Sequence, residues 1–131
     1  LNKKGAGVYF TVNQTNLEGR TTKHITKIRA VFCDFDGTPM PNNFDVLPHF
    51  IINTSPNKYH VYWLVKDMPL ESFTLYQQAL ASKFGSDRSV KDLPRLMRVA
   101  GMWHNKKKPY PVKIVKQNIM PEYTMEDIRD E

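Results

Sequence analysis

The chain has 131 residues, a length suited to one domain with one hydrophobic core, and no apolar run approaches the roughly 18 residues of a membrane-spanning helix. Its formal net charge is +6, and residues 1–121 hold 18 basic residues against 8 acidic ones. This balance favours a polyanionic partner, nucleic acid or nucleotide, although a solvated basic surface gives the same composition. The single cysteine, Cys33, excludes a disulfide framework and a cysteine-rich zinc site, and fits a reducing cytosol.

Short runs of β-branched and aromatic residues predict four strands in the first half of the chain. They cover residues 8–12, 28–36, 49–54 and 59–65. The last two are separated by Ser55-Pro56-Asn57-Lys58, in which proline and asparagine suit the central positions of a turn, so we expect a hairpin. Residues 37–43 are expected to form a loop.

One helix is predicted over residues 70–84, because its aromatic and aliphatic residues recur at helical spacing. Gly85 suits the end of this helix. Further along, residues 95–102 and 110–116 predict two strands, and residues 124–130 predict a short acidic helix. This order of strands, hairpins and one main helix indicates an α+β fold with a mostly antiparallel sheet, rather than a doubly wound parallel sheet.

Two acidic residues end the second predicted strand. Asp34 and Asp36 project from the same strand face because they lie two residues apart, while Phe35 points the other way. Two neighbouring carboxylates repel each other, and burial without a cation would raise the pKa of one of them. A divalent metal relieves both problems, and Mg²⁺ prefers oxygen ligands. The pattern predicts a metal site; the alternative is two solvated acids at an exposed strand end.

The same segment, Val31-Phe32-Cys33-Asp34-Phe35-Asp36-Gly37-Thr38, resembles the first motif of the haloacid-dehalogenase phosphatases. In that family Asp34 would be the nucleophile and Asp36 the general acid. The phosphatases need a parallel sheet, whereas this chain predicts hairpins. Pro39-Met40-Pro41 also follows where that family continues into a helix. The phosphatase hypothesis therefore stays as an alternative.

Two further segments favour a different family. One is TSPNKYHVYW, at residues 54–63, and the other is GSDRSVKDLPRLMRVAGMWHNK, at residues 85–106. Together with Asp34-x-Asp36 they resemble, over about residues 7–116, the RepB-like primases of plasmids, phages and integrated elements, within the archaeo-eukaryotic primase superfamily. The resemblance implies an RRM-like sheet with packed helices as catalytic core. It also implies a DNA primase or primase-polymerase that makes or extends primers on single-stranded DNA from nucleoside triphosphates, with Mg²⁺ or Mn²⁺.

The resemblance also implies roles for individual residues. Asp34 and Asp36 match the metal-binding acids of the first motif, and His60 matches a histidine that contacts the phosphates of the incoming nucleotide. The third metal-binding acid is expected at Asp87, with Asp92 as the alternative. Further contacts to the nucleotide are expected from three basic residues of the last segment: Arg95, Arg98 and Lys106.

The strand pattern gives His60 a position that does not depend on the resemblance. It shares a strand face with Tyr62 and Leu64, and more apolar residues take the opposite face. We therefore expect His60 on the less buried side, open to a ligand, whereas His24 and His49 are expected at the surface. Arg98 has no acidic partner nearby in sequence, so a ligand phosphate in the same cleft as His60 is its expected partner.

The catalytic domain is expected over residues 1–121, followed by an acidic segment, 122–131, as a possible linker to a missing domain. Because the first residue is Leu1, we expect the chain to be one domain of a longer protein, with a helicase as a possible partner. No membrane partner is expected. A binding-only module for single-stranded nucleic acid remains a further alternative, and it would need the basic and aromatic residues but not the acids.

Overall fold

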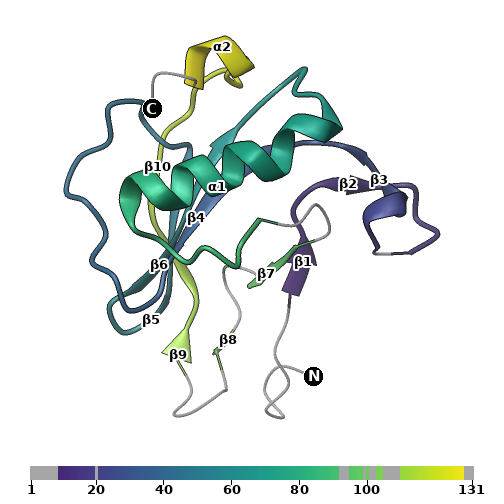
Figure 1. The fold of residues 1–131 in the computed structure, drawn as a ribbon. Coiled ribbons are helices and arrows are strands. Elements are labelled where there is room, and N and C mark those ends of the chain that lie inside the picture. The colour runs from purple at the N-terminus through teal and green to yellow at the C-terminus, as the bar shows by residue number, and fades with distance from the viewer. Residues whose placement is uncertain are drawn as a thin grey trace.

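The computed structural model describes residues 9–19, 21–91, 95–98, 100, 103–104 and 110–128; Asp92 and Lys106 lie outside these residues. The central sheet has four strands, in the spatial order β10 (Lys113–Gln117), β5 (Phe50–Ser55), β6 (Lys58–Leu64) and β4 (Ala30–Phe35). Every neighbouring pair in this sheet is antiparallel. The predicted α+β class with a mostly antiparallel sheet is confirmed (Figure 1).

Three smaller antiparallel pairs surround the central sheet. They are β1 (Tyr9–Thr11) with β7 (Leu96–Arg98), β2 (Gln14–Thr15) with β3 (Ile25–Lys27), and β8 (Trp103–His104) with β9 (Tyr110–Pro111). A short 3₁₀ turn, η2 (Thr22–His24), precedes β3. Within the expected strand over 95–102, β7 covers only residues 96–98, Arg95 and Ala100 lie outside the strand, and residues 99, 101 and 102 lie outside the described residues. The strands β2, β3 and β8 were not predicted.

The predicted helix consists of a 3₁₀ turn, η3 (Leu70–Ser72), and the helix α1 (Phe73–Phe84). Gly85 ends α1 with a φ of 69°, a left-handed conformation that glycine adopts without steric cost. In the described ranges, no helix has the length and apolar character needed to cross a membrane.

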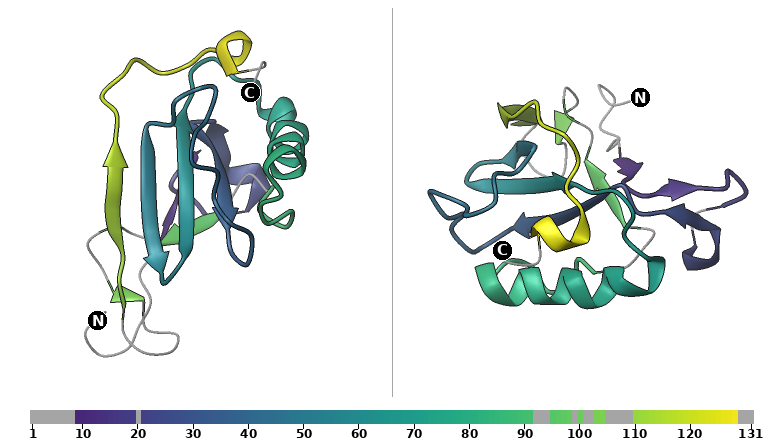
Figure 2. Two further views of the ribbon diagram at one scale, coloured as in Figure 1. Left: turned by 90° about the vertical axis from the view of Figure 1, so that its left-hand side faces the viewer. Right: turned by 90° about the horizontal axis from the view of Figure 1, so that it is seen from above.

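The helix α1 covers the edge of β4, at the side of the sheet opposite β10 (Figure 2). The contact is specific because the Gln77 side chain hydrogen-bonds the backbone of Phe32 in β4. The Phe32 N–H donates to Oε1 of Gln77 at 2.9 Å, and Nε2 of Gln77 donates to the Phe32 carbonyl at 2.9 Å. An edge strand would otherwise present these backbone groups without partners.

One face of the central sheet forms the aromatic core. It carries Val31, Cys33, Phe35, Val61 and Trp63, none more than 1% exposed. Trp63 packs against Phe44, from the loop after β4, with ring centroids 5.4 Å apart. It also stacks on Phe84 of α1 at 6.2 Å. Loop and helix together close this face.

The opposite face carries Asp34, His60 and Tyr62, because residues two apart on a strand share a face. The β1–β7 pair lies over it, since the ring of Phe10 in β1 packs on Tyr62 with centroids 6.3 Å apart. The polar face is therefore partly covered rather than open.

The C-terminal segment returns along the sheet. The Tyr123 N–H donates to the Leu64 carbonyl at 2.9 Å. The predicted acidic helix is present as α2 (Met125–Ile128), and its Ile128 is 1% exposed within the core. The proposed boundary at residue 121 stays a prediction.

His49 joins this segment to the sheet, and its expected position at the surface is wrong because it is 1% exposed. Nδ1 of His49 accepts the Leu64 N–H at 2.9 Å, so Nε2 carries the proton and donates to the Pro121 carbonyl at 3.0 Å. Both ring nitrogens of this buried histidine are thus satisfied by backbone groups.

Candidate active site

The register of β4 and β6 places Asp34 directly opposite His60. The Asp34 carbonyl points away from β6, because it accepts the Asp87 N–H at 2.9 Å. Asp34 and His60 are therefore a non-hydrogen-bonded pair in the ladder, the kind whose side chains lie closer together. Nε2 of His60 lies 3.5 Å from Oδ2 of Asp34. The structure thus brings an acid of the first motif and the predicted histidine into one site.

His60 is 7% exposed, against 0–1% for Val61 and Trp63 on the opposite face, so it lies on the less buried face as expected, but this face is covered rather than open. The reason is tertiary: the β1–β7 pair covers this face through Phe10 and Tyr62. Nδ1 of His60 is nevertheless without a hydrogen-bond partner among the described residues. Buried polar atoms are nearly always paired, so this nitrogen marks a place where a ligand can complete the structure.

Tyr62 shows the same feature two residues further along β6. Its hydroxyl is buried and has no hydrogen-bond partner among the described residues. Burial and, to a lesser extent, the negative charge of Asp34 raise the pKa of Tyr62. The phenol therefore stays protonated at neutral pH and can donate a hydrogen bond. Sequence analysis gave Tyr62 no role, although its i+2 spacing from His60 placed it on the same face.

Asp36 lies just beyond the end of β4 and pairs with a residue that the sequence analysis missed. Nζ of Lys58 is 3.0 Å from Oδ1 of Asp36, and the side chains are 44% and 51% exposed. The pair Phe35–Tyr59 separates this contact from the Asp34–His60 pair. Each acid thus faces a basic side chain across the β4–β6 ladder.

Asp87 reaches the site because the chain turns back after Gly85 and its N–H binds the Asp34 carbonyl. Its own carboxylate is engaged locally, since Oδ1 accepts from the N–H of Ser89 at 2.9 Å and from its hydroxyl at 2.7 Å. Within the described part of the chain, no three His, Cys, Asp or Glu side chains are grouped to hold a metal ion. The structure therefore brings Asp87 beside Asp34 through the backbone and not through its carboxylate.

The donor chemistry of Asp34 and Asp36 nevertheless fits a hard divalent cation. Mg²⁺ is commonly held by one or two carboxylates, with substrate phosphates and water as its other ligands. One oxygen of Asp34 faces His60 and one oxygen of Asp36 faces Lys58. The second oxygen of each carboxylate has no partner among the described residues, so these two residues would hold the metal.

Arg95 joins the Asp87 loop, because its guanidinium donates to the Ser89 carbonyl. Arg98 lies on β7, with its guanidinium carbon 4.7 Å from the centroid of the Tyr9 ring. Its Nη1 is buried without a hydrogen-bond partner in the described ranges. Both arginines are thus held by contacts with their own neighbours.

The register of β1 and β7 pairs Tyr9 with Arg98 and Phe10 with Met97. Because neighbouring residues on a strand point to opposite sides, Arg98 lies on the side of this pair that faces away from the Phe10–Tyr62 contact. The structure shows no contact between Arg98 and His60. Their predicted shared cleft stays a prediction.

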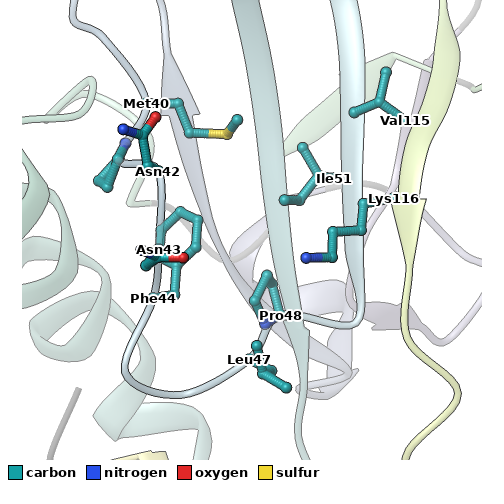
Figure 3. A pocket seen from close by; sticks show the side chains of 10 residues that line it. Met40, Asn42, Asn43, Phe44, Leu47, Pro48, Ile51, Val115 and Lys116 are labelled. Atoms are coloured by element: carbon teal, nitrogen blue, oxygen red, sulfur yellow. The ribbon is translucent and has the colours of Figure 1, made fainter.

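A groove of about 280 Å³ lies elsewhere, between the loop after β4 and the strands β5 and β10 (Figure 3). Its lining includes Ile51, which pairs with Val61 on the sheet face opposite His60. The groove is mainly apolar, with Lys116 as the charged residue of its lining. Without an acid it cannot serve as the metal site, so the candidate active site is the Asp34–His60 face.

Comparison with solved structures identifies the class of this fold. The AEP domain of the cyanophage S-2L primase-polymerase has a TM-score of 0.78 and 22% identity, covering 93% of this chain and 68% of that chain. The crystal structure of primase RepB′ has a TM-score of 0.59 and 22% identity, with coverages of 88% and 39%. The catalytic domain of RepB′ in complex with initiator DNA gives 0.58 and 20%, with coverages of 88% and 58%. The fold is therefore that of an archaeo-eukaryotic primase core.

Residues 40–129 match the RepB DNA-primase N-terminal domain, and the chain belongs to this family. The predicted family and the predicted enzyme class, a DNA primase, are confirmed. The matched residues include His60 and Asp87, whereas Asp34 and Asp36 precede them. The comparison with curated proteins gave no match. The chain spans only about two fifths to three fifths of the two RepB′ chains.

The phosphatase alternative, with Asp34 as nucleophile, is wrong. That family needs a parallel sheet, and all four strands of the central sheet here run antiparallel to their neighbours. The family match also assigns most of the chain to a primase domain.

Proposed function

We propose that this chain is the catalytic domain of a metal-dependent primase or primase-polymerase that makes or extends primers on single-stranded DNA from nucleoside triphosphates. One observation carries the proposal. Beside the Asp34 carboxylate, His60 and Tyr62 bury a ring nitrogen and a hydroxyl without partners among the described residues. A nucleotide phosphate offers acceptor oxygens to the imidazole and to the phenol, and a cation can join phosphate to carboxylate.

The carboxylates of Asp34 and Asp36 would hold Mg²⁺ or Mn²⁺, with Asp87 as the third acid. When bound, such ions supply activation of the attacking 3′-hydroxyl and neutralisation of the leaving pyrophosphate. His60 keeps Nε2 toward Asp34 and presents Nδ1 to a phosphate oxygen. Tyr62 acts as a neutral donor. Arg95 and Arg98 offer planar guanidinium groups that suit phosphate oxygens.

The partners follow from charge and from the relatives. The 18 basic residues among positions 1–121 suit a polyanionic template. One structural neighbour is a RepB′ catalytic domain in complex with initiator DNA, which supports DNA as the polyanionic partner here. A helicase, as a further domain or a separate protein, and a cytoplasmic replication system of a plasmid or phage complete the proposal.

Primer synthesis and primer extension on single-stranded DNA, with ribonucleotides or deoxyribonucleotides and with Mg²⁺ or Mn²⁺, test this function. The double change Asp34→Asn and Asp36→Asn should abolish nucleotidyl transfer and leave a cooperative thermal transition. Asp45→Asn removes a carboxylate from an exposed position in the loop after β4, and it should keep full activity. If the double variant still extends primers, the metal assignment is wrong. If the wild type binds DNA without divalent ions and never transfers a nucleotide, the chain is a binding module.

A further inference from the structure

Lys58 binds the acid that is proposed to hold a metal. Its Nζ lies 3.0 Å from Oδ1 of Asp36, at the end of the β4–β6 ladder. The backbone of Lys58 is fixed, because its carbonyl accepts a hydrogen bond from Nδ2 of Asn53 at 3.0 Å. The ammonium, in contrast, ends a flexible side chain that is 44% exposed. Lys58 therefore combines an anchored backbone with a movable charge.

A cation that binds Asp36 has to compete with this ammonium. Exposed ion pairs contribute little to stability, so displacing Lys58 from Asp36 costs little. The displaced ammonium cannot leave, because the hairpin holds its backbone two residues from His60. The displaced ammonium would then pair with another nearby anion, and in the proposed reaction that anion is the triphosphate of the nucleotide. Lysine serves such phosphates as a point charge.

We propose that Lys58 is an exchangeable counter-ion of the active site. It neutralises Asp36 in the metal-free protein and moves to the phosphates of the nucleotide once a divalent cation takes its place. This inference rests on the proposed function, and it gives one side chain two opposite effects. Lys58 weakens the binding of metal alone, and it strengthens the binding of nucleotide in the presence of metal.

Calorimetric titration of Lys58→Ala with Mn²⁺ alone, and then with a nucleoside triphosphate in saturating Mn²⁺, separates the two effects. The affinity for Mn²⁺ alone should rise by roughly two- to fivefold, the range that exposed ion pairs allow. The affinity for nucleotide should fall by roughly tenfold or more, as expected for a lost charge-assisted contact. Lys58→Arg keeps the charge and should restore much of the nucleotide affinity.

Lys27→Ala is the matched control, because it removes the same charge from an exposed position on β3. It should change neither affinity. If Lys58→Ala matches Lys27→Ala while the wild type binds both ligands, only this inference is overturned. A rise in nucleotide affinity on Lys58→Ala overturns it as well. A wild type that binds neither Mn²⁺ nor triphosphate overturns the proposed function itself.

Discussion

Tyr62 carries a hydroxyl that is buried without a hydrogen-bond partner among the described residues. The side chain is 5% exposed, and its ring packs against Phe10, Phe32 and His60. The aromatic ring therefore contributes to the core, while the hydroxyl loses its hydrogen bonds to water and gains none among the described residues. Such a group reduces the free energy of unfolding unless a ligand uses it.

We expect Tyr62→Phe to raise the free energy of unfolding by about 1 kcal/mol, because it removes an unsatisfied hydroxyl and keeps the ring. Tyr123→Phe is the matched comparison, since the Tyr123 hydroxyl donates to the Leu47 carbonyl at 2.8 Å. That variant should lose about 1 kcal/mol. Urea denaturation of both variants measures the difference. Equal destabilisation by the two changes would mean that Tyr62 has a partner in the folded protein.

The raised pKa of Tyr62 gives the same variant a second readout. The folded state keeps the phenol protonated where the unfolded state, with a pKa of about 10, begins to ionise. Ionisation of Tyr62 therefore leaves the free energy of unfolding unchanged below about pH 10 and lowers it progressively above that pH. Tyr62→Phe should lack this part of the alkaline destabilisation, as measured by thermal melts between neutral pH and pH 11.

At the scale of single residues, the sequence could predict acids and histidine but not their partners. Alternation along a strand put Asp34 and Asp36 on one face and His60 on a face with Tyr62. The pairing of Asp34 with His60, and of Asp36 with Lys58, depends on the register of two strands. Register is a tertiary property, and it explains why Lys58 was missed.

The helix α1 and the strand β4 depend on each other through one side chain. Gln77 is 1% exposed and makes three hydrogen bonds: two to the backbone of Phe32 and one to the Val90 carbonyl at 3.0 Å. It thereby joins α1, the edge of the sheet and the loop that carries Asp87. Because Asp87 binds the Asp34 carbonyl, Gln77 also helps to hold the site together.

Gln77→Ala should lower the free energy of unfolding by about 3 kcal/mol or more, because it leaves buried backbone groups unpaired, at about 1–3 kcal/mol each. Gln78→Ala makes the same chemical change on the next residue, which is exposed, and should stay within about 0.5 kcal/mol of the wild type. Guanidinium denaturation measures the free energies of unfolding of both variants, and we expect unchanged m-values. Similar losses from the two variants would contradict the role given to Gln77.

At the scale of elements, prediction succeeded where the local pattern was strong. The strands β4, β5 and β6 and the helix α1 lie close to their predicted bounds, because β-branched runs and helical spacing mark them. The strands β2 and β8 have two residues each, too short for any pattern to develop. Such strands exist only through their partners, so the sequence could not indicate them.

The whole molecule gathers its site from segments far apart in the chain. The strands β4 and β6 supply Asp34 and His60, and the turn after α1 supplies Asp87. The antiparallel topology aligns them, and this topology was predictable from the hairpins. The sequence could not predict that β1 and β7 cover the polar face, because this covering depends on how separate sheets pack.

The distribution of charge leads to a prediction for the intact chain. Residues 1–121 carry 18 basic and 8 acidic residues, so binding to single-stranded DNA should release counterions from the phosphates. The logarithm of the affinity should then fall linearly with the logarithm of the salt concentration, with a slope of about −0.7 for each phosphate contact. Fluorescence anisotropy with a labelled oligonucleotide, over a series of salt concentrations, measures the slope.

Single substitutions show which residues contribute to this salt dependence. A lysine or arginine that contacts a phosphate should, on replacement by alanine, make the slope less steep by about 0.7 and weaken binding to every sequence alike. Arg98→Ala tests one such residue. The contact of its guanidinium with Tyr9 places it on the side of the β1–β7 pair that faces away from Tyr62. Tyr9 is 48% exposed, so a base can stack beside its ring. Tyr9→Ala should therefore weaken binding while leaving the slope unchanged, because stacking releases no counterions. A salt response that is flat for the wild type would show that phosphate contacts do not dominate the interface. The excess of basic residues would then be only a solvated surface.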